Sequence, residues 1–402
     1  MSEVFEAAKV TDRVYWVGAI DWSLRDFHGY ETPRGSTYNA YLVMANKVVL
    51  IDTVRARFKN ELLSRIASVI DPGQIDVIVS NHSEMDHSGC LPALIDITQP
   101  ERVLASSKGV EALSRHFPAL AGRVEAVQDG QTLSLGDAAL TFIETRMLHW
   151  PDSMMTYLAD ERLLFSQDGF GIHLASTERF ADELSADGVE YEAARYYANI
   201  IMPFGARVAK VLPAVSKLDV GIIAPDHGPI HRRDPGRMIE LYQRWVDQTP
   251  TAKAVVVYDT MWGSTAKMAR AITEGLTSGG VSVKLMPLGA SHRSDVATEV
   301  LEAGALLVGS PTMNGQMFPT VADVLTYLKG LSPKHLIGAA FGSYGWGSRA
   351  VGQISEILRQ MKVELVHDGL DVQYVPNDDA LARCRALGKH VAETLIDRCR
   401  TS

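Results

Sequence analysis

The sequence contains only three cysteines in 402 residues, Cys90, Cys384 and Cys399, which lie far apart and never form a CxxC pair. This scarcity excludes a disulfide framework, a thiolate zinc site and a four-cysteine iron–sulfur cluster. The chain also lacks a basic stripe, and its net charge of −9 argues against a nucleic acid as partner. The residues MSEVFEAAKV lack the features of a signal peptide, and no apolar run approaches the roughly 18 residues that span a bilayer. We therefore expect a cytoplasmic protein that does not enter the membrane.

The length of the chain and its strand pattern indicate more than one domain. A single core rarely grows beyond about 250–300 residues, so 402 residues predict two or three domains. Up to about residue 250, short strands alternate with loops and few helices. The predicted elements are strands over 13–18, 75–81 and 220–228, hairpins over 38–53, 132–145 and 154–168, and helices over 58–70 and 190–215. Mixed strands with helices outside them predict an αββα sandwich.

From residue 253 the pattern becomes a regular βαβ alternation. The buried strand AKAVVVYDT is followed by a helix, and later strands are VSVKLMPL, ALLVGSPT, LIGAAFGS and a split VELVHDGLDVQYV. This spacing predicts a doubly wound parallel sheet covered on both faces. With a short linker over 247–251, we expect domains at residues 1–250 and 251–402.

A dense set of potential metal ligands follows the strand predicted over 75–81. The residues HSEMDH supply His82, Glu84, Asp86 and His87, and we expect an extended loop that can serve two cations. Three further candidates each end a predicted strand: His149, Asp168 and His227. A single histidine is usually a surface or hydrogen-bonded core residue, but the whole cluster favours a metal site.

Three loops at strand ends of the second part form a candidate flavin site. The segment TMWGST opens a helix, whose first N–H groups suit a monophosphate. Neither a Walker A loop nor a GxGxxG dinucleotide motif is present there. Trp262, Tyr344 and Trp346 offer flat faces for an isoalloxazine ring, so the expected cofactor is FMN. The expected FMN-binding residues are Thr260, Met261, Trp262, Gly263, Ser264, Thr265, Pro311, Thr312, Met313, Asn314, Gly315, Ser343, Tyr344, Gly345, Trp346 and Gly347.

The donor set favours iron over zinc at the metal site. Hydrolases of the metallo-β-lactamase type carry HxHxDH and bind zinc mainly through histidine, whereas here Glu84 replaces the second histidine. Imidazoles with three carboxylates and no thiolate suit a pair of iron ions that change between ferrous and ferric states. Zinc has no redox chemistry and would gain nothing from a neighbouring flavin.

With HSEMDH, LHWPDSM, FSQDGFG and APDHGPI, the chain resembles a flavodiiron protein (A-type flavoprotein) over nearly its whole length. The resemblance implies an α/β fold: a metallo-β-lactamase-like αββα sandwich, then a flavodoxin-like doubly wound parallel sheet. It also implies an enzyme that reduces dioxygen to water or nitric oxide to nitrous oxide with electrons from FMN. By the same resemblance, His82, Glu84 and His149 hold one iron, Asp86, His87 and His227 hold the other, and Asp168 bridges the pair.

The resemblance further implies how the protein works with its partners. The sequence matches the two-domain class, which takes electrons from a separate donor such as rubredoxin or another reductase. A head-to-tail homodimer, or a dimer of such dimers, would bring the FMN of one subunit to the irons of the next. His28, Tyr196 and Tyr197 would lie over the open side of the metals as catalytic residues, with ordinary packing as the alternative.

Two other functions stay open on the sequence alone. A zinc-dependent hydrolase with an appended flavodoxin domain would contain zinc and cleave an ester, thioester or lactam without a reductant. A pure electron carrier would bind FMN, and its first domain would hold no metal tightly.

Overall fold

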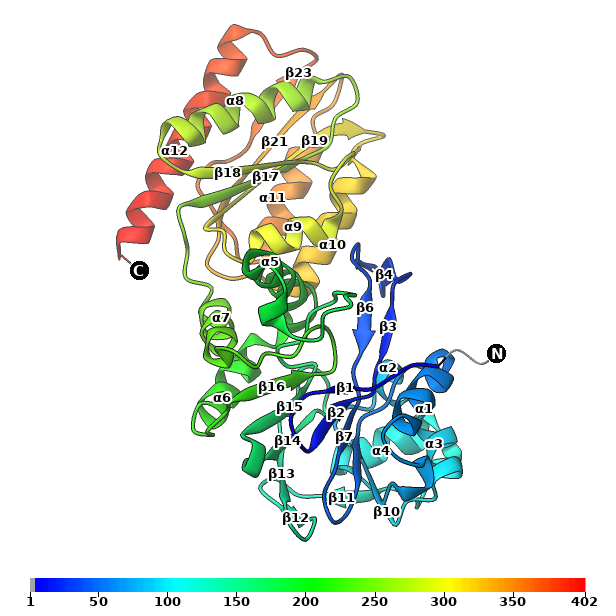
Figure 1. Cartoon of the computed structure of the whole chain (residues 1–402). Helices are drawn as coiled ribbons and strands as arrows, with labels where there is room; N and C mark the ends of the chain where they lie inside the picture. Colours follow the sequence, from blue (N-terminus) through cyan, green and yellow to red (C-terminus); the bar gives the residue numbers. More distant parts are fainter. Residues whose placement is uncertain (1–3, 402) are drawn as a thin grey trace. The chain divides into compact units, whose positions relative to one another are not determined.

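The computed structural model describes residues 4–401, which fall into two compact units (Figure 1). The first unit contains the chain up to Tyr196 together with Phe204–Gln243. The second contains Tyr197–Pro203 and the chain from Arg244 onward. The first unit is therefore built from two segments of the chain.

The first unit contains two sheets that form a sandwich. The larger sheet has the strand order β1-β2-β7-β8-β9-β10-β11, and the smaller has the order β12-β13-β14-β15-β16. The short strands β3 and β6 form a separate pair, as do β4 and β5. The bounds are β1 (Ala8–Lys9), β2 (Val14–Trp16), β3 (Ala19–Asp21), β4 (Asp26–Phe27), β5 (Tyr30–Glu31), β6 (Ser36–Tyr38), β7 (Tyr41–Val43), β8 (Val49–Ile51), β9 (Val77–Ser80), β10 (Arg102–Ser106), β11 (Glu125–Val127), β12 (Thr132–Ser134), β13 (Ala139–Glu144), β14 (Met154–Leu158), β15 (Leu163–Gln167) and β16 (Ile222–Pro225).

Alternation along the strands places the core between the two sheets. Val77 and Val79 of β9 share one buried cluster with Phe142 of β13 and Phe165 of β15. Ile78, the residue between the two valines, points to the opposite face because successive side chains of a strand alternate. That face is covered by helices, so the predicted αββα sandwich is confirmed. The helices of this part of the chain are α1 (Lys59–Ala67), α2 (Met85–Ser88), α3 (Leu91–Thr98), α4 (Ser107–His116), α5 (Ala186–Tyr196), α6 (Gly205–Val215) and α7 (Pro235–Asp247).

The helical stretch predicted over 190–215 is confirmed, although it is not one regular α-helix. After α5 the chain makes a π-helical turn, Tyr197–Ile201, and a 3-10 turn, Met202–Phe204, before α6 begins. Pro203 has no backbone N–H to donate, which prevents one continuous hydrogen-bond ladder. The stretch Ala186–Val215 is the one described helix with the length and apolar character of a membrane span, and 44% of its most apolar window is buried inside the protein.

The second unit is an open sheet with helices on both faces (Figure 1). The strand order is β18-β17-β19-β21-β22, with β20 beside β19 and β23 beside β21. Val256, Leu307, Ile272 and Leu387 belong to the core between this sheet, α8 and α12, and α9, α10 and α11 cover the other face. The flavodoxin-like prediction is confirmed. The bounds are β17 (Lys253–Tyr258), α8 (Ser264–Ser278), β18 (Ser282–Pro287), α9 (Arg293–Val300), β19 (Ala305–Met313), β20 (Gln316–Met317), α10 (Pro319–Leu331), β21 (Ile337–Tyr344), α11 (Ala350–Gln360), β22 (Glu364–Leu365), β23 (Leu370–Gln373) and α12 (Asp378–Thr401).

Candidate metal centre and flavin cavity

The candidate metal ligands lie on loops that follow strands of the first unit. His82 comes after β9, Asp168 after β15 and His227 after β16, while His149 lies between β13 and β14. Asn81 anchors the first of these loops. Its backbone N–H donates to Asp52 Oδ1 at 2.7 Å, its side-chain amide donates to Asp52 Oδ2 at 2.8 Å, and its Oδ1 accepts from Thr156 at 2.7 Å. All three residues are buried, so the start of the loop is held firmly.

The extended loop predicted for the ligand motif is wrong after Glu84. Glu84 itself has extended geometry, with φ −57° and ψ 144°, but the four-residue helix α2 begins at the next residue. The hydroxyl of Ser88 donates to the carbonyls of Ser83 and Glu84 and closes this turn. The helical turn separates Glu84 from Asp86 and His87, so one short segment supplies ligands to two different groups.

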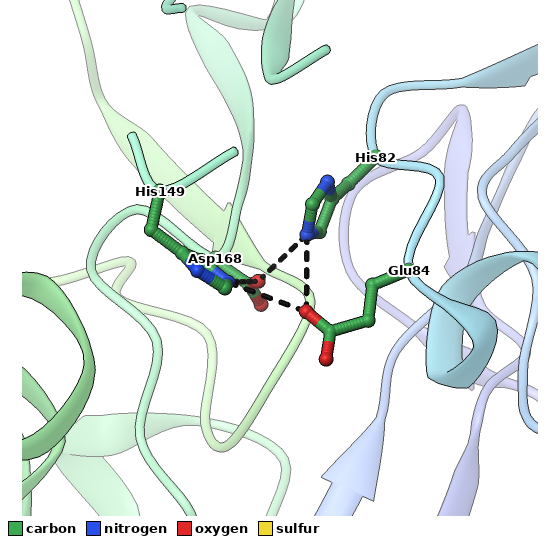
Figure 2. Close-up of side chains that lie close together, drawn as sticks. All are labelled: His82, Glu84, His149 and Asp168. Carbon is green, nitrogen blue, oxygen red and sulfur yellow. Dashed lines mark hydrogen bonds and ion pairs between the residues drawn. The ribbon is translucent and has the colours of Figure 1, made fainter. Parts of the chain in front are cut away.

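The first group consists of His82, Glu84, His149 and Asp168, whose side chains converge in Figure 2. His82 Nε2 lies 3.4 Å from both Glu84 Oε2 and Asp168 Oδ2. His149 Nε2 lies 2.9 Å from Asp168 Oδ2 and 3.4 Å from Glu84 Oε2. Ligand atoms held at about 2.0–2.2 Å by one ion are on the order of 3 Å apart, so these spacings match a shared cation.

The second group consists of Asp86, His87 and His227. His87 Nε2 lies 3.4 Å from Asp86 Oδ1, and His227 Nε2 lies 3.3 Å from Asp86 Oδ2. The other oxygen of Asp168, Oδ1, lies 3.3 Å from His87 Nε2 and 3.4 Å from His227 Nε2. Asp168 therefore directs one carboxylate oxygen to each group.

Several ligand atoms of the second group are buried without a hydrogen bond. Among the residues that the structure describes, these atoms are both oxygens of Asp86, Nε2 of His87 and Oδ1 of Asp168. Buried polar atoms are normally paired, so unpaired ones need an explanation. Cations bound between these groups would pair them, and the imidazole and carboxylate donors suit iron.

The electrostatics of the two groups also suit cations. Burial by itself disfavours charge, yet the Asp152 and Glu84 carboxylates raise the pKa of His82 well above its ordinary value. Burial would raise the pKa of Glu84, but hydrogen bonds with His149 and His82 lower it to about 2. Burial likewise opposes ionisation of Asp168, while the nearby His87 lowers its pKa well below the usual range. Protons on histidine thus balance the carboxylates when no metal is bound, and metal binding would release them.

Sequence reasoning missed the groups that support the ligand histidines from behind. Asp152 Oδ2 lies 3.0 Å from His82 Nδ1 and accepts from the backbone N–H of Ser83 at 2.6 Å. His227 Nδ1 lies 2.6 Å from the carbonyl oxygen of Thr37. Asp226 Oδ2 lies 3.4 Å from His87 Nδ1. Asp152 and Asp226 stand inside the motifs LHWPDSM and APDHGPI, which is the signal that could have revealed them.

Another buried histidine, His173, was also missed although it lies two residues after FSQDGFG. Its ring centroid lies 4.5 Å from that of His227 and 5.0 Å from that of Tyr196. Its Nδ1 lies 2.7 Å from the hydroxyl of Ser36. Burial, reinforced by the nearby His227, lowers the pKa of His173 well below its ordinary value, so its ring is neutral.

The three residues expected over the metals lie in different surroundings. His28 Nε2 lies 3.5 Å from Glu84 Oε1, and the His28 side chain is 75% exposed. Tyr196 is buried, and burial followed by the charge of Asp168 raises its pKa well above the ordinary value. Tyr197 begins the π-helical turn and packs in the second unit, where its ring centroid lies 5.2 Å from that of Trp245. Tyr196 and Tyr197 are consecutive in the sequence, but Tyr196 belongs to the first unit and Tyr197 to the second.

The second unit contains a cavity of about 450 Å³ at the carboxyl ends of its strands. Helix α8 begins beside it after Gly263, whose φ of 87° favours glycine, and no side chain caps the first N–H groups of the helix. These groups therefore stay available for an anion such as a phosphate. The residues that line the cavity are Met261, Trp262, Ser264, Pro311, Thr312, Ser343, Tyr344, Gly345, Trp346, Tyr374 and Val375.

The other residues expected at the flavin support the cavity walls or form turns outside its lining. Thr265 and Ser343 join two of the loops through their hydroxyls, which are 2.9 Å apart. Thr260 accepts a hydrogen bond from Gly263 N–H at 3.1 Å. The loop predicted over 310–315 is mostly strand, because β19 continues to Met313 and only Asn314-Gly315 turn into β20. Gly347 lies in the loop after β21. Tyr374 and Val375, after β23, were not predicted.

Comparisons with known proteins match both parts of the chain. The family described as "ODP family beta lactamase" matches residues 37–228, and the family "Flavodoxin" matches residues 256–388. A nitric oxide reductase of Moorella thermoacetica is 46% identical over 393 residues, which cover 96% of this chain and 98% of that protein. A rubredoxin-oxygen oxidoreductase of Megalodesulfovibrio gigas is 44% identical over 395 residues, which cover 97% of this chain and 98% of that protein. The crystal structure of the flavodiiron protein from Giardia intestinalis superposes with a TM-score of 0.96 at 34% identity, covering 100% of this chain and 99% of that one.

Proposed function

The chain belongs to the flavodiiron protein family, and from this premise we propose that it reduces dioxygen to water, nitric oxide to nitrous oxide, or both. It is an oxidoreductase, and its cofactors are FMN and a di-iron centre. The proposed iron ligands are His82, Glu84, His149, Asp86, His87 and His227, with Asp168 as the bridge. The proposed domain boundary lies between residues 250 and 251.

The observation that carries this proposal is the position of Asp168. Its Oδ2 lies 2.9 Å from His149 Nε2, and its Oδ1 lies 3.3 Å from His87 Nε2. A single carboxylate directed at two ligand groups supports a bridged pair of ions over one isolated ion. Such a pair can bind two substrate atoms side by side. The three carboxylates and the oxidoreductase relatives support this function over a zinc hydrolase.

The chain's own residues prepare the site for redox chemistry. An iron pair and a reduced flavin together supply four electrons when both cofactors are bound, which suits reduction of dioxygen without release of peroxide. Asp168 would hold the two ions at a fixed separation. Burial of Asp86, His87 and Asp168 keeps bulk water away from the ligand atoms. Tyr196 keeps its proton at neutral pH because its pKa is raised, so its hydroxyl can donate a hydrogen bond beside Asp168.

In the second unit, the N–H groups of α8 would bind the phosphate of FMN, and the cavity would hold its ring. Trp262 and Trp346, which are 93% and 95% exposed, would cover the ring. We further propose a cytoplasmic location and a separate electron donor such as rubredoxin. The proposed assembly is a head-to-tail homodimer, or a dimer of such dimers, in which FMN of one subunit meets the irons of the next.

Metal and flavin analysis of protein purified without oxygen tests the proposal. We expect about two irons and one FMN per chain. Protein that contains zinc, lacks iron and hydrolyses an ester without a reductant would support the hydrolase instead. Protein with FMN and no tightly bound metal would support the electron carrier.

A further inference from the structure

The two halves of the proposed metal site have matching sets of ligands. Each half has two imidazoles and one carboxylate of its own, Glu84 in the first and Asp86 in the second, and both halves share Asp168. The ligands alone therefore give the two ions the same formal charge. Any difference between the ions must come from their surroundings, which include the groups behind the ligands.

The groups behind the histidines differ between the halves. In the first half, Asp152 Oδ2 lies 3.0 Å from His82 Nδ1, within hydrogen-bond distance. In the second half, His227 Nδ1 faces the neutral carbonyl of Thr37 at 2.6 Å. His87 Nδ1 has no hydrogen bond among the described residues, although Asp226 Oδ2 lies 3.4 Å away.

Asp152 is held firmly in the position from which it reaches His82. Its carboxylate accepts from Ser83 N–H at 2.6 Å, and its backbone carbonyl accepts from the hydroxyl of Ser106 at 2.6 Å. The residue is only 2% exposed, so water does not weaken its contact with His82. A carboxylate in this position fixes the proton of His82 on Nδ1 and leaves the Nε2 lone pair for a metal.

We propose that Asp152 is a positioning residue that makes the two iron sites inequivalent, so that the ion bound by His82, Glu84 and His149 is held more tightly and is oxidised first. This inference rests on the proposed function. A carboxylate behind a ligand histidine makes the imidazole more basic, and a more basic ligand stabilises ferric iron more than ferrous iron. The first electron that an oxidant such as ferricyanide removes from the diferrous pair would therefore come from this ion, which leaves one ferric and one ferrous site.

The variant Asp152→Asn tests the proposal because it removes the charge and keeps the size. Loss of a group behind a ligand typically weakens metal binding by about 10- to 100-fold. With a competing chelator, we expect this variant to retain close to one iron per chain where the native protein retains two. With iron resupplied, its first oxidation should shift to a higher potential and the EPR signal of the half-oxidised state should change.

Two matched variants separate charge from local disruption. Ser106→Ala removes the hydrogen bond to the backbone of Asp152 and leaves its carboxylate intact. Asp226→Asn removes the carboxylate that lies 3.4 Å from His87 Nδ1 in the other half of the site. Ser106→Ala should keep the native first potential and the native EPR signal. Asp226→Asn should keep the native first potential, because it acts on the other ion, and any change should appear in the second oxidation. Asp152→Glu keeps the charge, so its first potential and its iron content should be closer to the native values than those of Asp152→Asn.

Native protein provides a test that does not depend on any variant. Metal-free protein titrated with ferrous iron should bind the two ions in two distinct steps of unequal affinity. Two ions bound with equal affinity would overturn the proposal, as would an Asp152→Asn protein with two irons and an unchanged first potential. Native protein that binds no iron at all would instead overturn the proposed function, so the two failures are distinguishable.

Discussion

Replacement of Asn81 by Ala is expected to destabilise the first unit strongly and to loosen the metal site. The side chain of Asn81 donates to Asp52 Oδ2 and accepts from Thr156, and all of these groups are buried. Alanine leaves Asp52 Oδ2 and the Thr156 hydroxyl without these hydrogen bonds, while the backbone N–H of residue 81 still donates to Asp52 Oδ1. A buried group that loses its partner costs about 1–3 kcal/mol, so we expect a loss of roughly 2–6 kcal/mol in the free energy of unfolding.

The charge of Asp52 gives this loss a pH dependence. Burial raises the pKa of Asp52 to about 6, and the hydrogen bonds from Asn81 oppose that rise by favouring the charged form. The side-chain bond, which alanine removes, contributes most when Asp52 is ionised, that is, above about pH 6. The loss caused by Asn81→Ala should therefore be larger at pH 7.5 than at pH 5.

Urea denaturation of the metal-free variant measures this effect, with FMN fluorescence reporting the second unit separately. Asn377→Ala is a matched control, because Asn377 Oδ1 accepts from Ala380 N–H at the start of α12 and the residue is exposed. Loss of such a cap costs about 1 kcal/mol. A loss below about 1 kcal/mol for Asn81→Ala, or the same loss at both pH values, would refute the reasoning.

Three further changes have defined outcomes. Asp168→Ala should keep FMN but lose iron and gas reduction, and a variant that keeps two irons by metal analysis would contradict the bridging role. A fragment over 252–402 should fold and bind FMN in a fluorescence titration, and a folded fragment without affinity for FMN would contradict the flavin site. Burial lowers the pKa of His231 to about 4, whereas the unfolded value is about 6.5. The free energy of unfolding therefore falls by up to about 3 kcal/mol as the pH falls from 6.5 to 4. The variant His231→Gln should show a smaller fall in acid denaturation curves.

Sequence patterns predicted the parts of the fold and site that depend on local periodicity. The apolar run along β9 identified the buried strand, and the position of His82 just after it indicated a site at the strand's end. The types of ligand predicted the metal, because a carboxylate at Glu84 in place of a histidine favours iron over zinc.

Other features depended on short segments that periodicity cannot detect. A helix of four residues such as α2 contains barely one turn, so the sequence around Asp86 looked extended. The break between α5 and α6 separates Tyr196 from Tyr197, although both lie in one apolar helical pattern.

The groups that support the ligand histidines come from distant parts of the chain, so local patterns could not predict their contacts. Asp152 meets His82 across 70 positions, and Thr37 meets His227 across 190. A single sequence does not show which loops converge, so the motifs that contain Asp152 and Asp226 did not show which histidine each one supports. Their roles became visible only with the folded structure.

The proposed function requires that an iron pair at this site reduces a gas with electrons from FMN. The most direct test compares iron-loaded and zinc-loaded forms of the same protein, each with FMN, after reduction under argon and addition of dioxygen or nitric oxide. We predict that the iron form consumes at least one gas over many turnovers, and that the zinc form does not. Equal consumption by the zinc form, or none by a form with two irons and FMN, would contradict the account.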